Sequence, residues 1–285
     1  MLLAQITDTH IVAPGTLFRC PVQGSAPDAE RVWCEFDTGP YLERAVATLD
    51  ALVPKPDIVV VTGDLVDHGE PAEYERLRRL LAPLSMPAFV IPGNHDAREP
   101  LRHAFAADGY LPRTGFLHYT VEDYPVRLVA LDTHIPGAVG GELCRERLSW
   151  LDRALAAAPE RPTLVLMHHP PFITGIGHMD RIGLTGIPGF IEIIAHHSQV
   201  ERILCGHLHR AIDRRLAGTV AGTAPSTAHQ VALDLAPAAP LAFTFEPPGY
   251  QLHWWSEEGG LVTHTGLIGE WPRLQRAGKG QLQVG

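Results

Sequence analysis

Short apolar runs recur along the chain, and patterns with the helical period follow several of them. The runs comprise residues 2–7, 57–62, 88–91, 126–131, 163–167 and 202–205. Residues 40–53, 71–84, 100–107 and 145–158 are helix candidates, because apolar side chains recur there three and four positions apart. This alternation of strand and helix predicts a largely parallel sheet with helices packed on the outside.

The pattern changes beyond residue 209, where the helical signal fades. Residues 231–235, 241–245, 252–255 and 261–265 alternate in polarity or are rich in β-branched and aromatic side chains. These four runs predict strands of a second sheet. We therefore expect one domain over residues 1–270 with a β-rich C-terminal part, 211–270. Residues 271–285 are predicted to be a loosely held tail.

Potential ligands follow each of the first six apolar runs directly. The run ends carry Asp8-Thr9-His10, Gly63-Asp64-Leu65-Val66-Asp67, Pro92-Gly93-Asn94-His95-Asp96, Asp132-Thr133, His168-His169-Pro170-Pro171 and Gly206-His207-Leu208-His209. In an open α/β sheet, ligands bind in the crevice at the carboxyl ends of the strands. We therefore expect six strands to supply one pocket.

The side chains at these strand ends indicate transition metals. Imidazole nitrogen and carboxylate oxygen suit Fe, Mn, Zn or Co, and the sequence does not choose among these metals. The candidate ligands are Asp8, His10, Asp64, Asn94, His168, His207 and His209. Seven ligands are too many for one tetrahedral ion. With one shared carboxylate they fit two ions, which is the usual arrangement for displacement at phosphorus.

Five motifs carry a family resemblance. D-x-H, G-D-x-x-D, G-N-H-D, H-H-P-P and G-H-x-H occur in this order within residues 1–235. They resemble the calcineurin-like binuclear metallophosphoesterase superfamily. Residues 63–71 and 168–172 are most similar to bacterial class III 3′,5′-cyclic-nucleotide phosphodiesterases and related glycerophosphodiesterases. The resemblance implies an α/β fold, a four-layer α/β/β/α sandwich of two stacked mixed sheets with flanking helices.

The resemblance also implies roles for individual residues. One metal is expected at Asp8, His10 and His209, the other at Asn94, His168 and His207, with Asp64 bridging the two. His95 is expected to protonate the leaving group or stabilise the transition state, and Asp67 to orient His95. A plain turn role for Asp67 is the alternative reading. Asp96 is expected to cap the following helix.

Three further histidines are weaker candidates for substrate binding. His169 lies inside a motif, where it would support a ligand or face the substrate. His178 and His229 lie in loops that could reach the phosphate or the leaving group. Residues 19–36 belong to a segment too long for a routine loop between strand and helix. Since related proteins are shorter here, we expect an insertion near the active site, either a lid or subunit contact or a mobile surface loop.

The implied activity is hydrolysis of small phosphodiesters, foremost 3′,5′-cyclic nucleotides such as cAMP, by a hydroxide that bridges the two metals. The alternatives are a glycerophosphodiesterase or broad-specificity phosphodiesterase, and further a phosphomonoesterase or a non-catalytic metal-binding scaffold. No G-x-S-x-G motif supports a serine hydrolase. The rim segments 19–36, 172–186 and 222–230 contain few cations, which favours diesters over dianionic monoesters.

Composition limits the binding partners and the cellular location that we expect for the protein. The net charge of −9 gives no electrostatic footprint for duplex nucleic acid or an anionic membrane surface. We expect a cytoplasmic protein, because no signal-peptide or membrane-spanning pattern is present. The cysteines show no CxxC spacing and predict no disulfide framework; they are Cys20, Cys34, Cys144 and Cys205. The insertion and the aromatic C-terminal region suggest a homo-oligomer, a dimer or larger.

Overall fold

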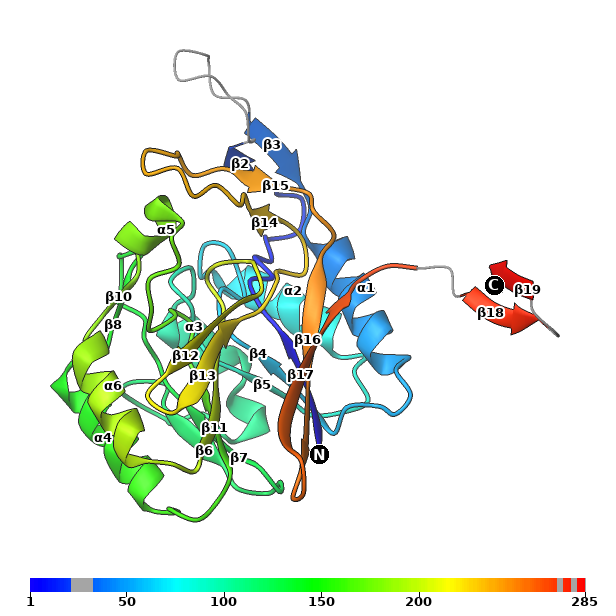
Figure 1. Ribbon diagram of the computed structural model, residues 1–285. Coiled ribbons are helices and arrows are strands. Elements are labelled where there is room, and N and C mark those ends of the chain that lie inside the picture. The colour runs from blue at the N-terminus through cyan, green and yellow to red at the C-terminus, as the bar shows by residue number, and fades with distance from the viewer. Residues whose placement is uncertain (22–32, 271–273, 278–280, 285) are drawn as a thin grey trace.

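The computed structural model describes residues 1–21, 33–270, 274–277 and 281–284. Two sheets dominate the fold, with helices packed on their outer faces (Figure 1). The first sheet has the strand order β17-β16-β1-β4-β5, and the second has the order β12-β13-β11-β9-β7-β6. The predicted four-layer α/β/β/α sandwich is therefore confirmed.

The first sheet is mixed. Its parallel strands are β1 (Leu2–Ile6), β4 (Ile58–Val61) and β5 (Ala88–Val90). Next to β1 lies the antiparallel hairpin of β16 (Gly249–Ser256) and β17 (Gly260–Leu267). Helices α1 (Gly39–Asp50), α2 (Pro71–Leu81) and α3 (Arg98–Ala104) pack their apolar faces against this sheet.

The second sheet has a parallel centre and antiparallel edges. Its centre contains β7 (Arg127–Ala130), β9 (Thr163–Leu166), β11 (Val200–Cys205) and β13 (Thr219–Thr223). Its edges are β6 (Tyr119–Val121) and β12 (Ile212–Leu216). The outer helices are α4 (Arg145–Ala156) and α6 (Ile187–His196).

Short elements complete the described chain. Two are hairpins, formed by β2 (Phe18–Pro21) with β3 (Trp33–Phe36) and by β18 (Leu274–Ala277) with β19 (Gln281–Val284). Two are short strand pairs, β8 (Gly141–Glu142) with β10 (Leu184–Thr185) and β14 (Gln230–Val231) with β15 (Phe243–Thr244). The single-turn helices are η1 (Ala106–Asp108) and α5 (Gly177–Arg181). Among the described helices, none is both long and apolar enough to cross a membrane.

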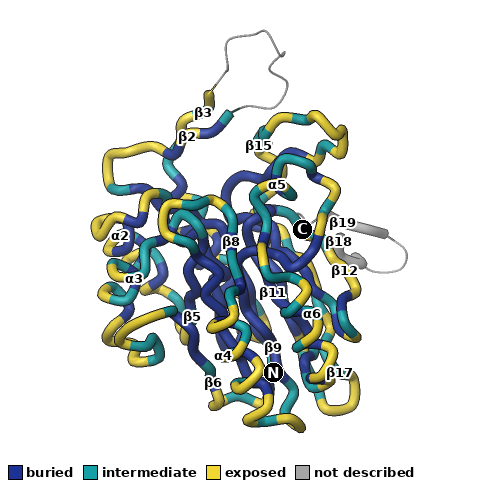
Figure 2. The backbone as a smooth tube through the Cα atoms, turned by 90° about the vertical axis from the view of Figure 1, so that its left-hand side faces the viewer, coloured by how far each residue is buried: buried dark blue, intermediate teal, exposed yellow. Residues whose placement is uncertain are grey.

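Side chains that point alternately to the two faces of each strand explain why the two sheets stack. All four residues of β4 are buried: Val59 and Val61 face α1 and α2, while Ile58 and Val60 lie between the sheets. In β9, Leu164 and Leu166 fill the same middle layer. Strands buried on both faces read as continuous apolar runs, which is how these strands appear in the sequence. Figure 2 shows the result, a buried centre under partly exposed helices.

The predicted place of the C-terminal strands is wrong. Strands β16 and β17 do not form a second sheet, because β16 pairs antiparallel with β1 and extends the first sheet. Without β16, the outer edge of β1 would leave buried backbone groups without hydrogen bonds. The second sheet is built from earlier strands, including β12 and β13, which were not predicted. Strand β12 carries an Asp and two Arg, the charged pattern of an edge strand.

The structure describes two segments for which no strands were predicted. Within the predicted insertion, residues 19–36, the two ends form the β2–β3 hairpin; residues 22–32 lie outside the described residues. Within the predicted tail, 274–277 and 281–284 pair as a hairpin, and 271–273, 278–280 and 285 lie outside the described residues.

Candidate metal centre

The predicted ligands gather at the carboxyl ends of five neighbouring strands. Asp8 and His10 follow β1, Asp64 follows β4, Asn94 follows β5, His168 follows β9, and His207 and His209 follow β11. All of them except Asn94, which is half-buried, are buried. The sixth strand end, after β7, brings no ligand to this cluster: Asp132 pairs with Arg98, and Thr133 contacts His169.

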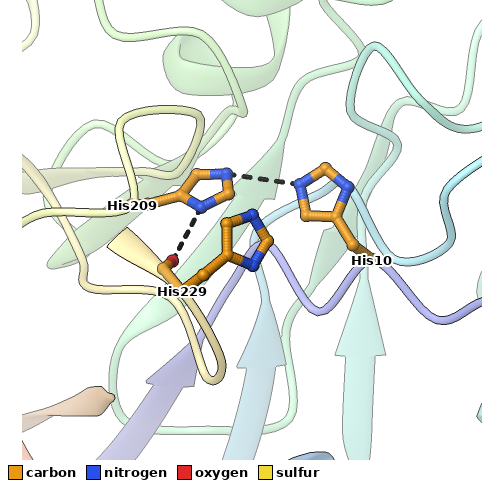
Figure 3. Close-up of side chains that lie close together, drawn as sticks. All are labelled: His10, His209 and His229. Atoms are coloured by element: carbon orange, nitrogen blue, oxygen red, sulfur yellow. Dashed lines mark hydrogen bonds between the residues drawn. The ribbon is translucent and has the colours of Figure 1, made fainter. Parts of the chain in front are cut away.

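The first group of ligand atoms surrounds His10 and His209. Their Nε2 atoms lie 3.2 Å apart (Figure 3). His10 Nδ1 lies 3.2 Å from Asp67 Oδ1, and His209 Nδ1 donates to the His229 carbonyl at 2.9 Å. Carboxylates and carbonyls only accept hydrogen bonds, so Nδ1 carries the proton in both neutral rings. The two Nε2 lone pairs therefore face each other, as they would around a cation.

Two carboxylates complete this first group. Asp8 Oδ1 lies 3.5 Å from His209 Nε2, and Asp64 Oδ2 lies 3.7 Å from His10 Nε2. The position of Asp8 is itself fixed, because both of its carboxylate oxygens accept from the His207 backbone N–H at 3.1 Å. Two imidazoles and two carboxylates form a donor set that suits a transition metal ion.

The second group surrounds His168 and shares Asp64 with the first. His168 Nε2 lies 3.3 Å from Asp64 Oδ2 and 3.2 Å from the Asn94 amide oxygen. The opposite nitrogen, Nδ1, donates to the Thr62 carbonyl at 2.8 Å. His207 donates through Nε2 to the Ile182 carbonyl at 3.2 Å, which leaves its Nδ1 with a lone pair. The same Asp64 oxygen thus faces both groups.

The donor geometry fits two metal ions. Each of the four imidazoles uses one nitrogen to contact a protein acceptor and keeps the other for a ligand position. Such outer hydrogen bonds fix the tautomer and orient metal-binding histidines in proteins. The shared carboxylate matches the bridge that two adjacent dications require. The structure therefore shows Asp and His groups able to hold metal ions.

Backbone strain is concentrated at the same residues. Six described non-glycine residues have positive φ, and five of them are predicted ligands: Asp8 at 52°, His10 at 42°, Asp64 at 47°, His207 at 70° and His209 at 50°. Left-handed backbone is unfavourable for side chains with a Cβ and persists where the surrounding structure enforces it. The chain thus turns sharply after β1, β4 and β11, which points these side chains inward.

Glycine is required where the loops pack most closely. A Cβ at Gly93 would collide with the backbone N and Oδ1 of Asp64. A Cβ at Gly206 would collide with the Thr7 hydroxyl and crowd His168. The glycines of the G-N-H-D and G-H-x-H motifs therefore serve the close approach of neighbouring strand ends.

His95 lies beside the cluster and contacts Asp67. Its Nδ1 donates to the Asp67 carbonyl at 2.8 Å, and Asp67 Oδ1 lies 3.3 Å from the same nitrogen. Burial alone would lower the pKa of His95, but the charge of Asp64 and the hydrogen bonds to Asp67 raise it to about 10. The imidazole is about one-third exposed, so it is reachable from the pocket. This geometry leaves Nε2 of His95 free to carry a proton.

Asp96 does not cap the helix that follows it, contrary to the prediction. Helix α3 begins at Arg98, after Ala97, without a side-chain cap. One Asp96 oxygen accepts from the backbone N–H groups of Gly93 and Leu65 at 2.8 and 3.1 Å, and the other accepts from the Tyr74 hydroxyl. Burial and the nearby Asp64 raise the pKa of Asp96 to about 7. Asp96 therefore ties the loops after β4 and β5 together.

The three weaker candidates occupy different surroundings. His169 is buried with both nitrogens engaged, by the Thr133 hydroxyl at 2.8 Å and the Val139 carbonyl at 3.3 Å. His178 lies in α5, and its Nδ1 is 3.5 Å from Nη2 of Arg181. His229 is completely buried, and neither ring nitrogen has a hydrogen-bond partner among the described residues. Its ring lies 4.7 Å from that of His209 and 5.4 Å from that of His10 (Figure 3).

Sequence reasoning missed an aromatic wall beside His229. Phe18 and Phe36, from β2 and β3, lie with ring centroids 4.4 and 5.7 Å from the His229 ring. Phe243, from β15, lies 4.9 Å from the same ring. Phe18 also lies 5.2 Å from the ring of His10. The spacing of Phe18 and Phe36 gave no signal, because the hairpin that brings them together was not predicted.

Comparisons with known proteins identify the family of this chain. Residues 1–211 match the family model of calcineurin-like phosphoesterases. A probable glycerophosphodiester phosphodiesterase, GpdQ, of Arcobacter nitrofigilis is 37% identical over 95% of this chain and 94% of its own length. A probable cyclic nucleotide phosphodiesterase of Synechococcus sp. is 37% identical over 88% of this chain and 91% of its own length.

A solved structure supports the fold independently. The crystal structure of a dimetal phosphatase from Danio rerio covers 94% of this chain and 99% of its own chain, with a TM-score of 0.60 at 15% identity. Identity this low shows the shared fold alone. The family model covers most of the chain, and the curated relatives span nearly all of it. The chain therefore belongs to the calcineurin-like phosphoesterase family.

Proposed function

We propose that this protein is a binuclear metal-dependent phosphodiesterase that hydrolyses small phosphodiesters, foremost 3′,5′-cyclic nucleotides such as cAMP. The observation that carries the proposal is the pair of ligand groups that share one oxygen of Asp64, with His95 beside them. A site of this kind serves in-line displacement at phosphorus without a covalent protein nucleophile.

The ligand atoms divide between two ions. Asp8, His10 and His209 would hold one, and Asn94, His168 and His207 would hold the other, with Asp64 shared by both groups. When bound, the ions neutralise charge on the phosphoryl oxygens and lower the pKa of water. The metals are drawn from Fe, Mn, Zn and Co, since imidazole and carboxylate accept all four. The neutral amide of Asn94 fills a ligand position without adding a third carboxylate.

His95 is the proposed general acid. Its Nδ1 is occupied by Asp67, so the proton for the leaving oxygen resides on Nε2. The carboxylate of Asp67 stabilises the imidazolium and holds the ring in place. Because Asp67 Oδ1 also contacts His10 Nδ1, the same carboxylate links the acid to a ligand of the first ion. His95 is thereby held at a fixed position relative to His10.

His229 is the proposed substrate contact. Its two ring nitrogens have no hydrogen-bond partner among the described residues, and its ring lies 4.7 Å from that of His209, so these nitrogens are available to a phosphoryl or leaving-group oxygen. His169 instead positions neighbouring groups, since both of its nitrogens contact the protein. Its ring lies 4.9 Å from that of His168 and 4.6 Å from that of His207. For His178, a role in substrate binding stays a prediction.

The surroundings favour a diester over a monoester. The wall beside His10 is aromatic, and an apolar hollow beside His207 is lined by Phe172, Met179 and Leu184. In this proposal, these apolar side chains would contact the second organic group on phosphorus. Glycerophosphodiesters are the second candidate class, because the two relatives named above, one of each activity, are equally identical to this chain.

The test is metal-dependent turnover of a chromogenic phosphodiester. Protein stripped with a chelator should be inactive, and activity should return with Mn, Co, Zn or Fe at two ions per chain. A phosphomonoester assayed in parallel should be hydrolysed with lower kcat/KM. Full activity in the stripped protein would refute the metal-dependent mechanism. Two bound ions without hydrolysis of any ester would instead support a non-catalytic scaffold.

A further inference from the structure

Two cysteines lie directly opposite each other in the hairpin beside the metal centre. In the antiparallel pair β2–β3, Cys20 is the register partner of Cys34, and both thiols are free. Directly opposed residues in such a pair have Cα atoms about 4.5 to 5.5 Å apart. A disulfide requires a Cα separation of about 4.4 to 6.8 Å. The register therefore places the two Cα atoms within the range that a disulfide requires.

Both cysteines share a face with the aromatic wall. Side chains alternate along a strand, so Cys20 and Cys34 point to the same side as Phe18 and Phe36, two positions away. These four residues pack together with Val12. The opposite face of the hairpin carries the exposed ion pair of Arg19 with Glu35 at 3.2 Å. The cysteine pair therefore lies directly behind the phenylalanines that contact His10 and His229.

The base of the hairpin is tied to the same ligand loop. The Arg76 guanidinium donates to the Val12 carbonyl at 3.0 Å and to Asp37 Oδ2 at 2.6 Å, so one side chain holds both ends of the segment. The Thr38 hydroxyl donates to the His10 carbonyl at 2.8 Å. A constraint placed on β2 and β3 is thus transmitted to a segment that already contacts His10.

We propose that Cys20 and Cys34 are a reversible dithiol–disulfide pair that fixes the spacing of β2 and β3 and stiffens the aromatic wall of the metal pocket. This inference does not depend on the proposed function. Its co-reactant is a low-molecular-weight disulfide such as oxidised glutathione. One thiolate attacks a glutathione sulfur and releases one reduced glutathione. The second thiolate then attacks the mixed disulfide and releases another, with both thiol protons passing to the two departing thiolates.

The surroundings assign an order to the two steps. Cys34 is half-buried, whereas Cys20 is only 2% exposed, so the external disulfide reaches Cys34 first. Burial and the adjacent Cys34 raise the pKa of the Cys20 thiol to about 12, so Cys20 reacts more slowly with an external disulfide than an exposed thiol would. Cys20 then reacts within the hairpin, where the mixed disulfide on its partner is adjacent. Cys144 and Cys205 have no cysteine as a register partner among the described strands.

The experiment compares the metal-loaded full-length protein after oxidised glutathione with the same protein after a reducing agent. Peptide mass spectrometry should find the peptides of Cys20 and Cys34 joined, with the loss of two hydrogen atoms. Hydrogen exchange at the backbone amides of residues 18–20 and 33–36 should be slower in the oxidised form. Reduction should restore both the separate peptides and the faster exchange.

Cys34→Ser is the test variant and Cys144→Ser is the matched control, because both replace a half-buried thiol. Oxidised glutathione should leave hydrogen exchange in Cys34→Ser unchanged, whereas Cys144→Ser should respond as the parent protein does. The proposal is overturned if Cys20 and Cys34 remain separately alkylated, if stable mixed disulfides with glutathione accumulate, or if the joined peptides exchange no more slowly. The parent protein alone decides these outcomes, so they stand even if a variant fails to fold.

Discussion

The ligand residues combine backbone strain with fixed side chains. Left-handed backbone at a residue such as His207 costs about 1 to 3 kcal/mol, and five predicted ligands adopt it. The surrounding hydrogen bonds offset this cost, as when Asp8 accepts from the His207 N–H and the His10 N–H donates to the Asp64 carbonyl. The site is therefore arranged by the protein itself, and its ligand atoms are directed inward by the fold.

In the proposed assignment Asn94 supplies a ligand to one ion only, so its removal should affect one metal site and spare the other. We expect Asn94→Ala to lose one of the two metal ions and to reduce diester turnover by at least ~100-fold, since even residues that only orient ligands contribute 10- to 100-fold. Metal content per chain, measured by elemental analysis, checks the first effect. Retention of two tightly bound ions would contradict the assignment of Asn94.

His95 should behave differently from its neighbour. His95→Ala is expected to keep both ions and to lose turnover by ~10²–10⁴-fold, the usual contribution of a general acid. The loss should be smaller for substrates with good leaving groups, which need less protonation. His103→Ala, an exposed histidine of α3, serves as the control and should match the parent protein. An equal loss for good and poor leaving groups would show that His95 positions the substrate.

At the scale of elements, an ion pair joins the end of β7 to α3. Arg98 donates to both carboxylate oxygens of Asp132, at 2.5 and 2.9 Å, and the backbone N–H groups of Leu117 and His134 donate to the same oxygens. Asp132 is completely buried. Burial alone would raise the pKa of Asp132, but the hydrogen bonds and charge of Arg98 lower it below its ordinary value.

Asp132→Asn should therefore destabilise the protein in a pH-dependent manner. Asparagine offers one acceptor oxygen in place of two and leaves the Arg98 charge unpaired, at a cost of about 3 to 5 kcal/mol. A lowered folded-state pKa gives stability that is fully present above the unfolded pKa of about 3.9 and is lost as the pH falls through the folded value. Urea unfolding should show the full difference in free energy of unfolding between Asp132→Asn and the parent protein at pH 7. Below about pH 4 this difference should be smaller.

Asp123→Asn is the matched control for this change, because Asp123 is exposed. The free energy of unfolding of this variant should differ from that of the parent protein by less than about 0.5 kcal/mol. A difference between Asp132→Asn and the parent that stays constant from pH 7 to pH 3 would show that the carboxylate charge of Asp132 contributes nothing.

Elements also show where sequence reasoning succeeds and where it stops. The strands that lead to Asp8, Asp64 and His168 were predictable, because buried parallel strands are continuous apolar runs that end in polar loops. The antiparallel partner of β1 could not be predicted, because its pairing with β16 depends on contacts between residues more than 240 positions apart in the sequence. Helix α6 was also missed, because its isoleucines favour strands as readily as a helix.

Within the site, the gathering of the candidate ligands could be predicted, but the groups that support them could not. Short motifs mark His207 and His209, whereas the carbonyls of Ile182 and His229 that orient them carry no sequence signal. The same limit explains Asp96, whose position before a helix resembles that of a cap. Its actual partners, Leu65 and Gly93, follow other strands and become neighbours only in the folded protein.

At the scale of the whole molecule, stacking the two sheets brings their carboxyl ends together along one edge. The loops after strands of the first sheet supply Asp8, His10, Asp64 and Asn94. Those after strands of the second sheet supply His168, His207 and His209. Neither sheet alone holds a complete ligand set for two ions. Folding of the sandwich and assembly of the metal centre are therefore coupled.

Under the proposed function, we expect the net charge of −9 and the aromatic surroundings of the site to influence substrate choice. A monoester dianion gains most from fixed cations, but Arg98 is paired with Asp132, and Arg19 with Glu35. A diester has one negative charge fewer and a second organic group, which the wall of Phe18, Phe36 and Phe243 can contact. Substrate preference should therefore follow the organic group as well as the phosphorus centre.

This reasoning predicts the order of kcat/KM for cAMP, glycerophosphocholine and a simple phosphomonoester under matched metal loading. Both diesters should exceed the monoester, with cAMP first, because a purine can stack against the aromatic wall while glycerol cannot. Phe243→Ala should then reduce kcat/KM for cAMP by about 5- to 10-fold, as expected for the loss of one aromatic contact, and should affect glycerophosphocholine less. Preference for the monoester would refute the diesterase proposal. A higher kcat/KM for glycerophosphocholine would instead assign the protein to the second class, and equal effects of Phe243→Ala on both diesters would show that the wall does not select the base.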